Sequence, residues 1–169
     1  MSIKASDVGE WLRHRAGKRD HRDVVSDDYL VLRPGAIDVR SRVTLREPVA
    51  RLGIAPLTSM FLAGENQPTA DDYRPEVHDS DGLQIATGSG EWLWRPLSNP
   101  RGVFVTSFSM PKVRGYGLMQ RDRSFTSYQD LEARYELRPS AWVEPLNDWG
   151  GGRIELLQFH TPNETHDNV

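Results

Sequence analysis

A histidine and several acids stand close together near the middle of the chain. His78, Asp79 and Asp81 lie in the polar run Arg74–Gly82, and Glu76 adds a third carboxylate. In extended backbone, residues two positions apart point to the same side, so Asp79 and Asp81 would lie near each other. A neighbouring carboxylate raises the pKa of one member of such a pair, which suits it to acid–base catalysis. The alternative is an Asp-Gly turn in which Asp79 accepts hydrogen bonds from nearby backbone amides.

Tryptophans form the second group of candidate residues. Trp92 and Trp94 alternate within Glu91–Arg95, so a strand there would turn both indoles to one side. A flat apolar indole can pack on the C–H face of a sugar while nearby acids and arginines bind the hydroxyl groups. Tryptophans in strands are also ordinary core residues. The spacing leaves both interpretations open, a carbohydrate groove and a hydrophobic core.

Charges of both signs alternate densely over Gln120–Glu136, and Asp130 is one of them. Such a segment is either a solvated face with weak ion pairs or a hydrogen-bonding wall for a polyhydroxylated ligand. Metal signals are incomplete, since His160 and His166 flank a terminal loop and Asp79–Gly82 lacks the full calcium-loop pattern. We therefore expect neither a metal ion nor a cofactor.

The elements that would position these side chains are mostly strands. Residues 37–45 alternate between apolar and polar, as in a half-buried strand. Further strand-like runs, separated by turn signals, cover 83–87, 91–95, 103–108, 115–120, 141–144 and 153–159. Many short strands at regular spacing predict an all-β fold, an antiparallel sandwich or barrel. Only Ser127–Leu137 has helical spacing, with Tyr128, Leu131 and Tyr135 on one face.

Residues 1–28 differ from the rest of the chain. They are rich in charges of both signs and poor in apolar side chains. Ser6 could cap a short helix that ends at Gly17, and the segment 18–28 has the composition of a solvated, disordered stretch. We expect a short helix or disorder over residues 1–28.

Composition excludes several classes of protein. The 169 residues include 21 basic and 24 acidic side chains without a clustered basic stripe, so we expect no nucleic-acid partner. No apolar run approaches the roughly 18 residues of a membrane span. The absence of cysteine excludes disulfides and thiolate chemistry. The first residues lack the apolar segment of a signal peptide, so the chain as written is expected in the cytosol. The oligomeric state stays open.

Longer motifs carry a resemblance to a known family. They are Leu52–Phe61, Gly64–Asn66, Arg74–Gly82, Gly90–Leu97, Gly115–Arg121, Tyr128–Glu136, Arg138–Ser140, Trp142–Pro145, Asp148–Gly150 and Asp167–Val169. Over residues 29–169 the chain closely resembles the periplasmic glucans biosynthesis proteins G and D (the MdoG/OpgG type). The resemblance does not extend to residues 1–28.

The resemblance implies a fold, a compartment and a substrate. Proteins of this family are longer than this chain and have a signal peptide, a large antiparallel β-sandwich similar to the mutarotase-type sugar-binding fold, and an immunoglobulin-like domain. They act in the periplasm in making osmoregulated glucans with a β-1,2-linked backbone. Members are similar to glycoside hydrolases that cleave β-1,2-glucan with inversion. The implied partner is therefore a β-glucan oligo- or polysaccharide.

The resemblance also assigns roles to particular positions. The catalytic acid falls on Asp167, and the base, which works through a relay of hydroxyl groups, falls on Asp79 with Asp81 as its competitor. Tyr135 and Arg138 fall where the sugar pocket of the family is lined. The residues expected to bind substrate are Glu76, His78, Asp81, Trp92, Trp94, Asp130, Tyr135 and Arg138.

Three hypotheses follow from the sequence. The first is a segment of a glycosidase that acts on β-1,2-glucan, and the second is a non-catalytic module that binds or assembles glucan. The third is a truncated product without activity of its own, because residues 29–169 would be the C-terminal portion of an incomplete sandwich without the immunoglobulin-like domain. Missing neighbouring strands would leave unpaired sheet edges.

Overall fold

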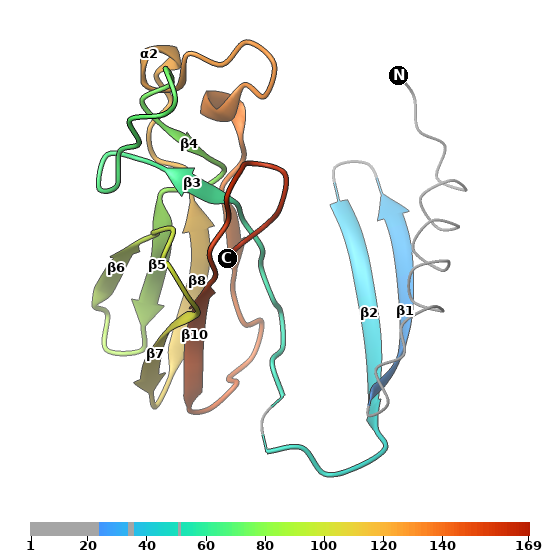
Figure 1. Ribbon diagram of the computed structural model, residues 1–169. Helices are drawn as coiled ribbons and strands as arrows, with labels where there is room; N and C mark the ends of the chain where they lie inside the picture. Colours follow the sequence, from blue (N-terminus) through green and yellow to red (C-terminus); the bar gives the residue numbers. More distant parts are fainter. Residues whose placement is uncertain (1–23, 34–35, 51) are drawn as a thin grey trace. The chain divides into compact units, whose positions relative to one another are not determined.

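The computed structural model describes residues 24–33, 36–50 and 52–169 (Figure 1). The chain divides into two compact units, Met1–Ile54 and Ala55–Val169. The short helix expected between Ser6 and Gly17 lies outside the described residues. Among the residues that are described, no helix has the length and apolar character needed to cross a membrane.

The first unit contains a two-stranded antiparallel sheet. β1 (Val24–Arg33) pairs with β2 (Ala36–Leu45) along its whole length. The strand predicted over 37–45 is therefore confirmed. The disorder expected over 18–28 is wrong from Val24 onward, because β2 supplies the backbone partners that order residues whose charged composition favours a solvated stretch.

The second unit is built from two antiparallel sheets and a short strand pair. Four strands form a sheet in the order β6 (Trp92–Pro96), β5 (Gly82–Thr87), β8 (Val113–Met119) and β9 (Ala141–Val143). Two more strands, β7 (Phe104–Met110) and β10 (Gly152–Gln158), form the second sheet. The six strands that the sequence predicted between residues 83 and 159 are thus confirmed.

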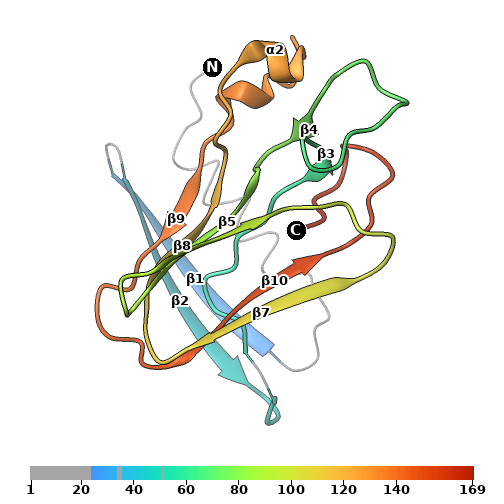
Figure 2. The ribbon, with the colours of Figure 1, turned by 90° about the vertical axis from the view of Figure 1, so that its left-hand side faces the viewer.

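The hydrophobic core lies between these two sheets. Alternation along β5 points Leu83 and Ile85 to one side, where they are 4% and 1% exposed. Tyr116 and Leu118 of β8 join them, and Leu156 of β10 contributes from the facing sheet. Because both sheets bury one face in the same cluster, the unit is an all-β sandwich, and Figure 2 shows β7 and β10 packed across from β5 and β8.

A small strand pair and a second cluster stand at one end of the sandwich. β3 (Phe61–Ala63) pairs with β4 (Val77–His78), and neither was predicted, because strands of two or three residues carry no periodic signal. The second cluster buries Met60, Val77, Tyr128 and Tyr135. It fastens the β3–β4 pair to the chain around residues 128–135.

The helix predicted over Ser127–Leu137 is wrong. The chain forms a four-residue helix α2 (Phe125–Tyr128) and a separate 3-10 turn η1 (Tyr135–Leu137). Between them Gln129 and Arg134 have left-handed φ values of 53° and 51°, which no continuous α-helix contains. The Asp130 carboxylate accepts hydrogen bonds from the backbone N–H groups of residues 132 and 133, and this local bonding replaces helical bonding.

Candidate active site at Asp79 and Asp167

Asp79 directly follows strand β4 and faces a cation. Its backbone N–H donates to the Met60 carbonyl at 2.9 Å. Its Oδ1 lies 3.0 Å from Arg138 Nε, an ion pair whose geometry falls outside that of a hydrogen bond. Burial raises the pKa of the Asp79 carboxyl, the Arg138 charge opposes the rise, and the negative charge of Asp167 adds to it. Asp79 is therefore a carboxylate with increased proton affinity beside a counter-ion.

Asp167 lies near the C-terminus and is exposed, and its neighbour holds it in place. Thr58 Oγ1 donates a hydrogen bond to Asp167 Oδ2 at 2.9 Å. Asn168, which is 2% exposed, bonds through its side chain to both backbone groups of Phe61 and to the Phe159 carbonyl. The hydrogen bonds of the buried Asn168 side chain thus fix the backbone next to the exposed Asp167 carboxyl.

The segment 58–61 connects the two acids. Thr58 bonds to Asp167, and Ser59 exchanges backbone hydrogen bonds with the residues that follow Asp167. Met60 accepts the hydrogen bond from Asp79 N–H. Asp79 and Asp167 are far apart in sequence, and this shared support brings them into electrostatic contact.

Asp81 is engaged differently from Asp79. Its Oδ2 accepts hydrogen bonds from the backbone N–H groups of Arg121 and Asp122, the latter at 3.4 Å. Its Oδ1 lies 3.7 Å from His78 Nε2. The turn hypothesis expected Asp79 to bond nearby amides, but here Asp81 bonds amides about forty positions along the chain. Asp81 therefore holds the segment after β8 against the start of β5.

Glu76 and His78 are buried in the protein. Their side chains are 5% and 1% exposed, and His78 Nε2 is 2.8 Å from Glu76 Oε2. The imidazole also stacks on Phe61 at 5.2 Å and meets Tyr128 edge-on at 5.3 Å. Both residues were expected to bind substrate. In the structure their buried side chains contact each other and the neighbouring aromatic rings.

Two groups among the described residues could hold a metal ion: Glu65, Glu76 and Asp122 form one, and Glu76 and His78 with Asp81 form the other. Ligand atoms of Glu76, His78 and Asp81 lie within 4.8 Å of one another. A metal-bound histidine normally donates its other N–H to an acceptor, and His78 Nδ1 has no hydrogen-bond partner among the described residues. Its Nε2 is already committed to Glu76. The geometry is that of a buried hydrogen-bonded pair.

Tyr135 and Arg138 stand together beside Asp79. Arg138 lies over the Tyr135 ring with its guanidinium carbon 5.5 Å from the centroid, and 45% of its side chain is exposed. Tyr135 is buried, and its hydroxyl donates to Glu164 Oε2 at 3.0 Å. Burial raises the pKa of the Tyr135 hydroxyl, and the Glu164 charge adds to this. Tyr135 is thus a neutral hydrogen-bond donor.

The chain matches a known protein family. The model of the family described as "Periplasmic glucan biosynthesis protein, MdoG" matches residues 29–169. The chain belongs to the MdoG family. The resemblance expected from the sequence motifs is therefore confirmed.

Relatives named glucans biosynthesis protein G are closely similar to this MdoG-family chain. The protein of Ralstonia nicotianae is 61% identical over 143 residues, which cover 82% of this chain and 28% of that protein. The protein of Pseudomonas paraeruginosa is 57% identical, with 82% and 27% covered. That of Pseudomonas putida is 56% identical over 144 residues, with 83% and 26% covered. The chain spans little more than a quarter of the length of these relatives.

Trp92 and Trp94 of this MdoG-family chain lie on the sheet face that points away from the core. The register places Trp92 opposite Ala86 and Trp94 opposite Gln84, whereas Leu93 packs against the core. Trp92 stacks on Trp142 at 5.8 Å. Their contacts are therefore with the outer face of the sheet, and the fold does not place them among the groups that surround Asp79.

Two glycines allow the indoles of Trp94 and Trp142 to pack closely on the sheet. A Cβ atom on Gly82 would approach the Trp94 ring to 2.4 Å, and one on Gly115 would approach the Trp142 ring to 2.5 Å. Such distances are shorter than any real contact, so only glycine lets the rings lie close to the backbone. Arg121 covers the Trp94 ring at 4.8 Å. The indoles of Trp94 and Trp142 therefore pack directly on the backbone at Gly82 and Gly115.

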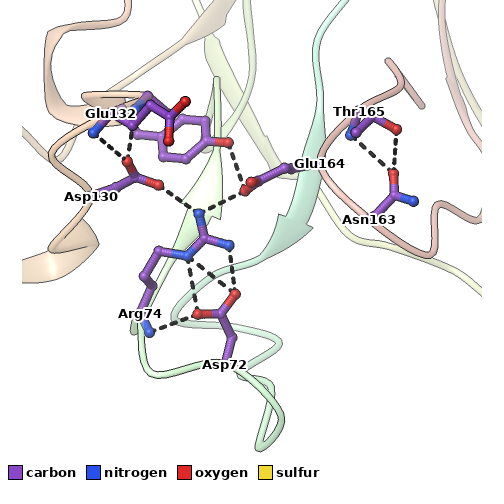
Figure 3. A network of polar contacts seen from close by, with 9 residues as sticks. Asp72, Arg74, Asp130, Glu132, Asn163, Glu164 and Thr165 are labelled. Atoms are coloured by element: carbon purple, nitrogen blue, oxygen red, sulfur yellow. Dashed lines mark hydrogen bonds and ion pairs between the residues drawn. The ribbon is translucent and has the colours of Figure 1, made fainter.

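Two residues of the site, Arg74 and Asn168, were not among those predicted from the sequence, and Asp130 was predicted in a different role. Asp130 was expected to bind substrate, but its carboxylate is occupied by two backbone amides and by Arg74, which also pairs with Asp72 and Glu164 (Figure 3). Arg74 and Asn168 belong to the motifs that carry the family resemblance, yet their partners are set only by the fold.

Proposed function

We propose that this MdoG-family chain takes part in making osmoregulated periplasmic glucans by acting on β-1,2-linked glucan as an inverting glycoside hydrolase. Asp167 serves as the general acid and Asp79 as the general base. The observation that carries the proposal is the pairing of these two carboxyls across the segment 58–61, with an arginine at one and solvent at the other. The family of relatives named for glucan biosynthesis supports the substrate class.

The proposed reaction uses each carboxyl in one step. Asp167 is exposed and donates its proton to the glycosidic oxygen as the bond from that oxygen to the anomeric carbon breaks. Water attacks the anomeric carbon from the opposite face, and its proton passes through sugar or water hydroxyls to Asp79. The raised pKa of Asp79 strengthens it as a base, while Arg138 favours its ionised form before the reaction.

Asp79 fits the base role better than Asp81. One Asp81 oxygen already accepts two backbone amides, and the other faces the buried His78 ring. The Asp79 carboxyl instead pairs with the Arg138 side chain, and burial and the charge of Asp167 raise its pKa. A proton acceptor must have an oxygen available to the relay, and Asp79 meets this requirement.

Leaving-group dependence tests the two roles. In this chain and in a full-length relative, Asp167→Asn should lower the release of reducing ends from β-1,2-glucan by about 10²–10⁴-fold. It should affect much less an aryl β-glucoside whose acidic phenol departs without protonation. Asp79→Asn should impair both substrates, since water still needs a base. Equal losses on both substrates for Asp167→Asn would contradict its role as the acid.

A second candidate function is non-catalytic glucan binding on the outer sheet face. Trp92 is 57% exposed and stacks on Trp142, whose ring lies flat over Gly115. Flat indole faces suit the C–H faces of successive sugar rings. Calorimetric titration with β-1,2-linked oligosaccharides should give a heat that Trp92→Ala abolishes and Trp149→Ala, a tryptophan outside the stack, retains. Absence of heat for the wild-type chain would exclude this function.

A further inference from the structure

Arg74 joins three separate segments of the second unit. Its NH2 lies 2.6 Å from Asp72 Oδ2, and its NH1 lies 2.5 Å from Asp130 Oδ2 and 2.7 Å from Glu164 Oε2. Figure 3 shows the guanidinium at the centre of these carboxylates. The Arg74 side chain is only 13% exposed. One partly buried cation is therefore shared by acids from the loop before β4, the turn after α2 and the C-terminal segment.

We propose that Arg74 is a positioning residue that holds the C-terminal segment in place, and through it the proposed acid Asp167 and the side chains of Tyr135 and Arg138 beside Asp79. This inference rests on the proposed hydrolase function for its catalytic consequence. Its structural part stands on the contacts of Arg74 alone.

The first route of this effect runs along the chain to Asp167. Glu164 comes three residues before Asp167, and Asn168 comes directly after it. Arg74 holds Glu164 on one side, while the buried Asn168 side chain fixes the other. The carboxyl of Asp167 is thereby carried on a short segment that is anchored at both ends.

The second route runs through side chains to Asp79. Glu164 Oε2 accepts the hydrogen bond from the Tyr135 hydroxyl, and the same oxygen contacts Arg74. Arg138 lies over the Tyr135 ring and pairs with Asp79 Oδ1. Contacts therefore lead without interruption from Arg74 to the base.

The chemistry of the cluster explains why an arginine stands there. A guanidinium offers five N–H donors in a rigid plane, so it can engage several carboxylates at once. A lysine ammonium has one compact charge and cannot reproduce this fork. Without a cation at position 74, three carboxylates would remain close together in a partly buried place and would repel one another. The exposed Glu164 is the one that can most readily move away.

Hydrogen exchange tests the structural part without any substrate. In Arg74→Ala, the backbone amides of residues 160–169 should exchange about tenfold or more faster, while those of β5 and β8 stay protected as in the wild type. Arg74→Lys should give an intermediate result, and Arg153→Ala, which removes an exposed arginine on β10, should change neither region. Unchanged exchange over 160–169 in Arg74→Ala would overturn the proposal, as would an equal increase in β5 and β8.

Kinetics test the catalytic part. Arg74→Ala should lower kcat on β-1,2-glucan by about 10²-fold, since small displacements of catalytic groups cost this much. Glu164→Gln combined with Arg74→Ala should lower kcat less than the product of the two single effects, because both changes break the same connection. Independent multiplication of the two effects would contradict action through Glu164. A wild-type protein without hydrolytic activity would defeat the proposed function and leave the exchange result standing.

Discussion

The Asn168 side chain forms hydrogen bonds with both backbone groups of Phe61: Oδ1 accepts from the N–H at 2.8 Å, and Nδ2 donates to the carbonyl at 3.0 Å. Asn168 directly follows Asp167, and Phe61 directly follows Met60, whose carbonyl accepts the Asp79 N–H. One buried amide group thus ties together the segments that carry the proposed acid and base.

Asn168→Ala should therefore destabilise the protein and displace Asp167. The variant leaves the Phe61 N–H and carbonyl buried without their partners, which should lower the free energy of unfolding by about 2–3 kcal/mol. Urea unfolding monitored by tryptophan fluorescence measures this change. Asn147→Ala, at an exposed asparagine, serves as the matched control and should change the free energy of unfolding by less than about 0.5 kcal/mol. Equal values for the two variants would contradict the anchoring role.

The ionisation of Asp79 should make stability depend on pH. Burial raises the pKa of this carboxyl above its ordinary value of 3.8, so the folded protein binds the proton more tightly than the unfolded chain. The free energy of unfolding therefore decreases as the pH rises from the ordinary value to the raised one. Asp79→Asn removes this decrease, so relative to wild type it should gain stability above that window.

Asp148 is the control for this prediction, because its pKa is shifted in the opposite direction. The pKa of Asp148 is lowered by hydrogen bonds from Gly150 N–H and Lys112, so its contribution to stability is present above pH 3.8 and is lost as the pH falls. Asp148→Asn should lose stability at neutral pH and not in acid. Urea unfolding at a series of pH values from about 3 to 7 measures both variants. Parallel pH curves for Asp79→Asn and wild type would refute the prediction.

Packing of the indoles on the outer sheet face makes a third prediction. Gly115→Ala would place a methyl group 2.5 Å from the Trp142 ring, so the indole must shift. We expect a loss of about 1–3 kcal/mol in the free energy of unfolding, as for other overpacked sites. Gly102→Ala is the control, because nothing lies within 4 Å of its Cβ position. Thermal unfolding compares the two, and a Gly115→Ala variant as stable as Gly102→Ala would show that the ring moves freely.

Much of the fold was predictable because strands have a local signal. Residues 37–45 and 83–87 alternate in hydrophobicity, and this pattern survives in the single sequence. The short pair β3 and β4 has no such signal. The helix expected over 127–137 had the right spacing, but the Asp130 carboxylate binds the backbone amides that a helix would use.

The two proposed catalytic acids could be predicted from the sequence, but the residues that hold them in place could not. Asp79 and Asp167 followed from the family motifs, and the structure brings them into electrostatic contact. The partners of Arg74 come from loops on either side of it in sequence, and no local pattern specifies which carboxylates it meets. The spacing of Trp92 and Trp94 predicted that both indoles share one face, but only the register of β6 shows that this is the outer face, away from Asp79.

The last prediction separates Asp79 from Asp81 as the proposed base. Asp81→Asn replaces a carboxylate that accepts the Arg121 and Asp122 amides, so charge-assisted bonds become weaker neutral ones. We expect this variant to unfold at lower urea concentration while its folded fraction retains kcat on β-1,2-glucan within about threefold. Asp79→Asn should show the reverse, with kcat lowered about 10²-fold or more and stability at neutral pH increased. The steady-state rate on β-1,2-glucan at saturating substrate, divided by the folded fraction that the urea unfolding curve gives, measures both quantities on each variant. If Asp81→Asn loses activity and keeps its stability, the base is Asp81, and the amides of residues 121 and 122 must release its carboxylate when substrate binds.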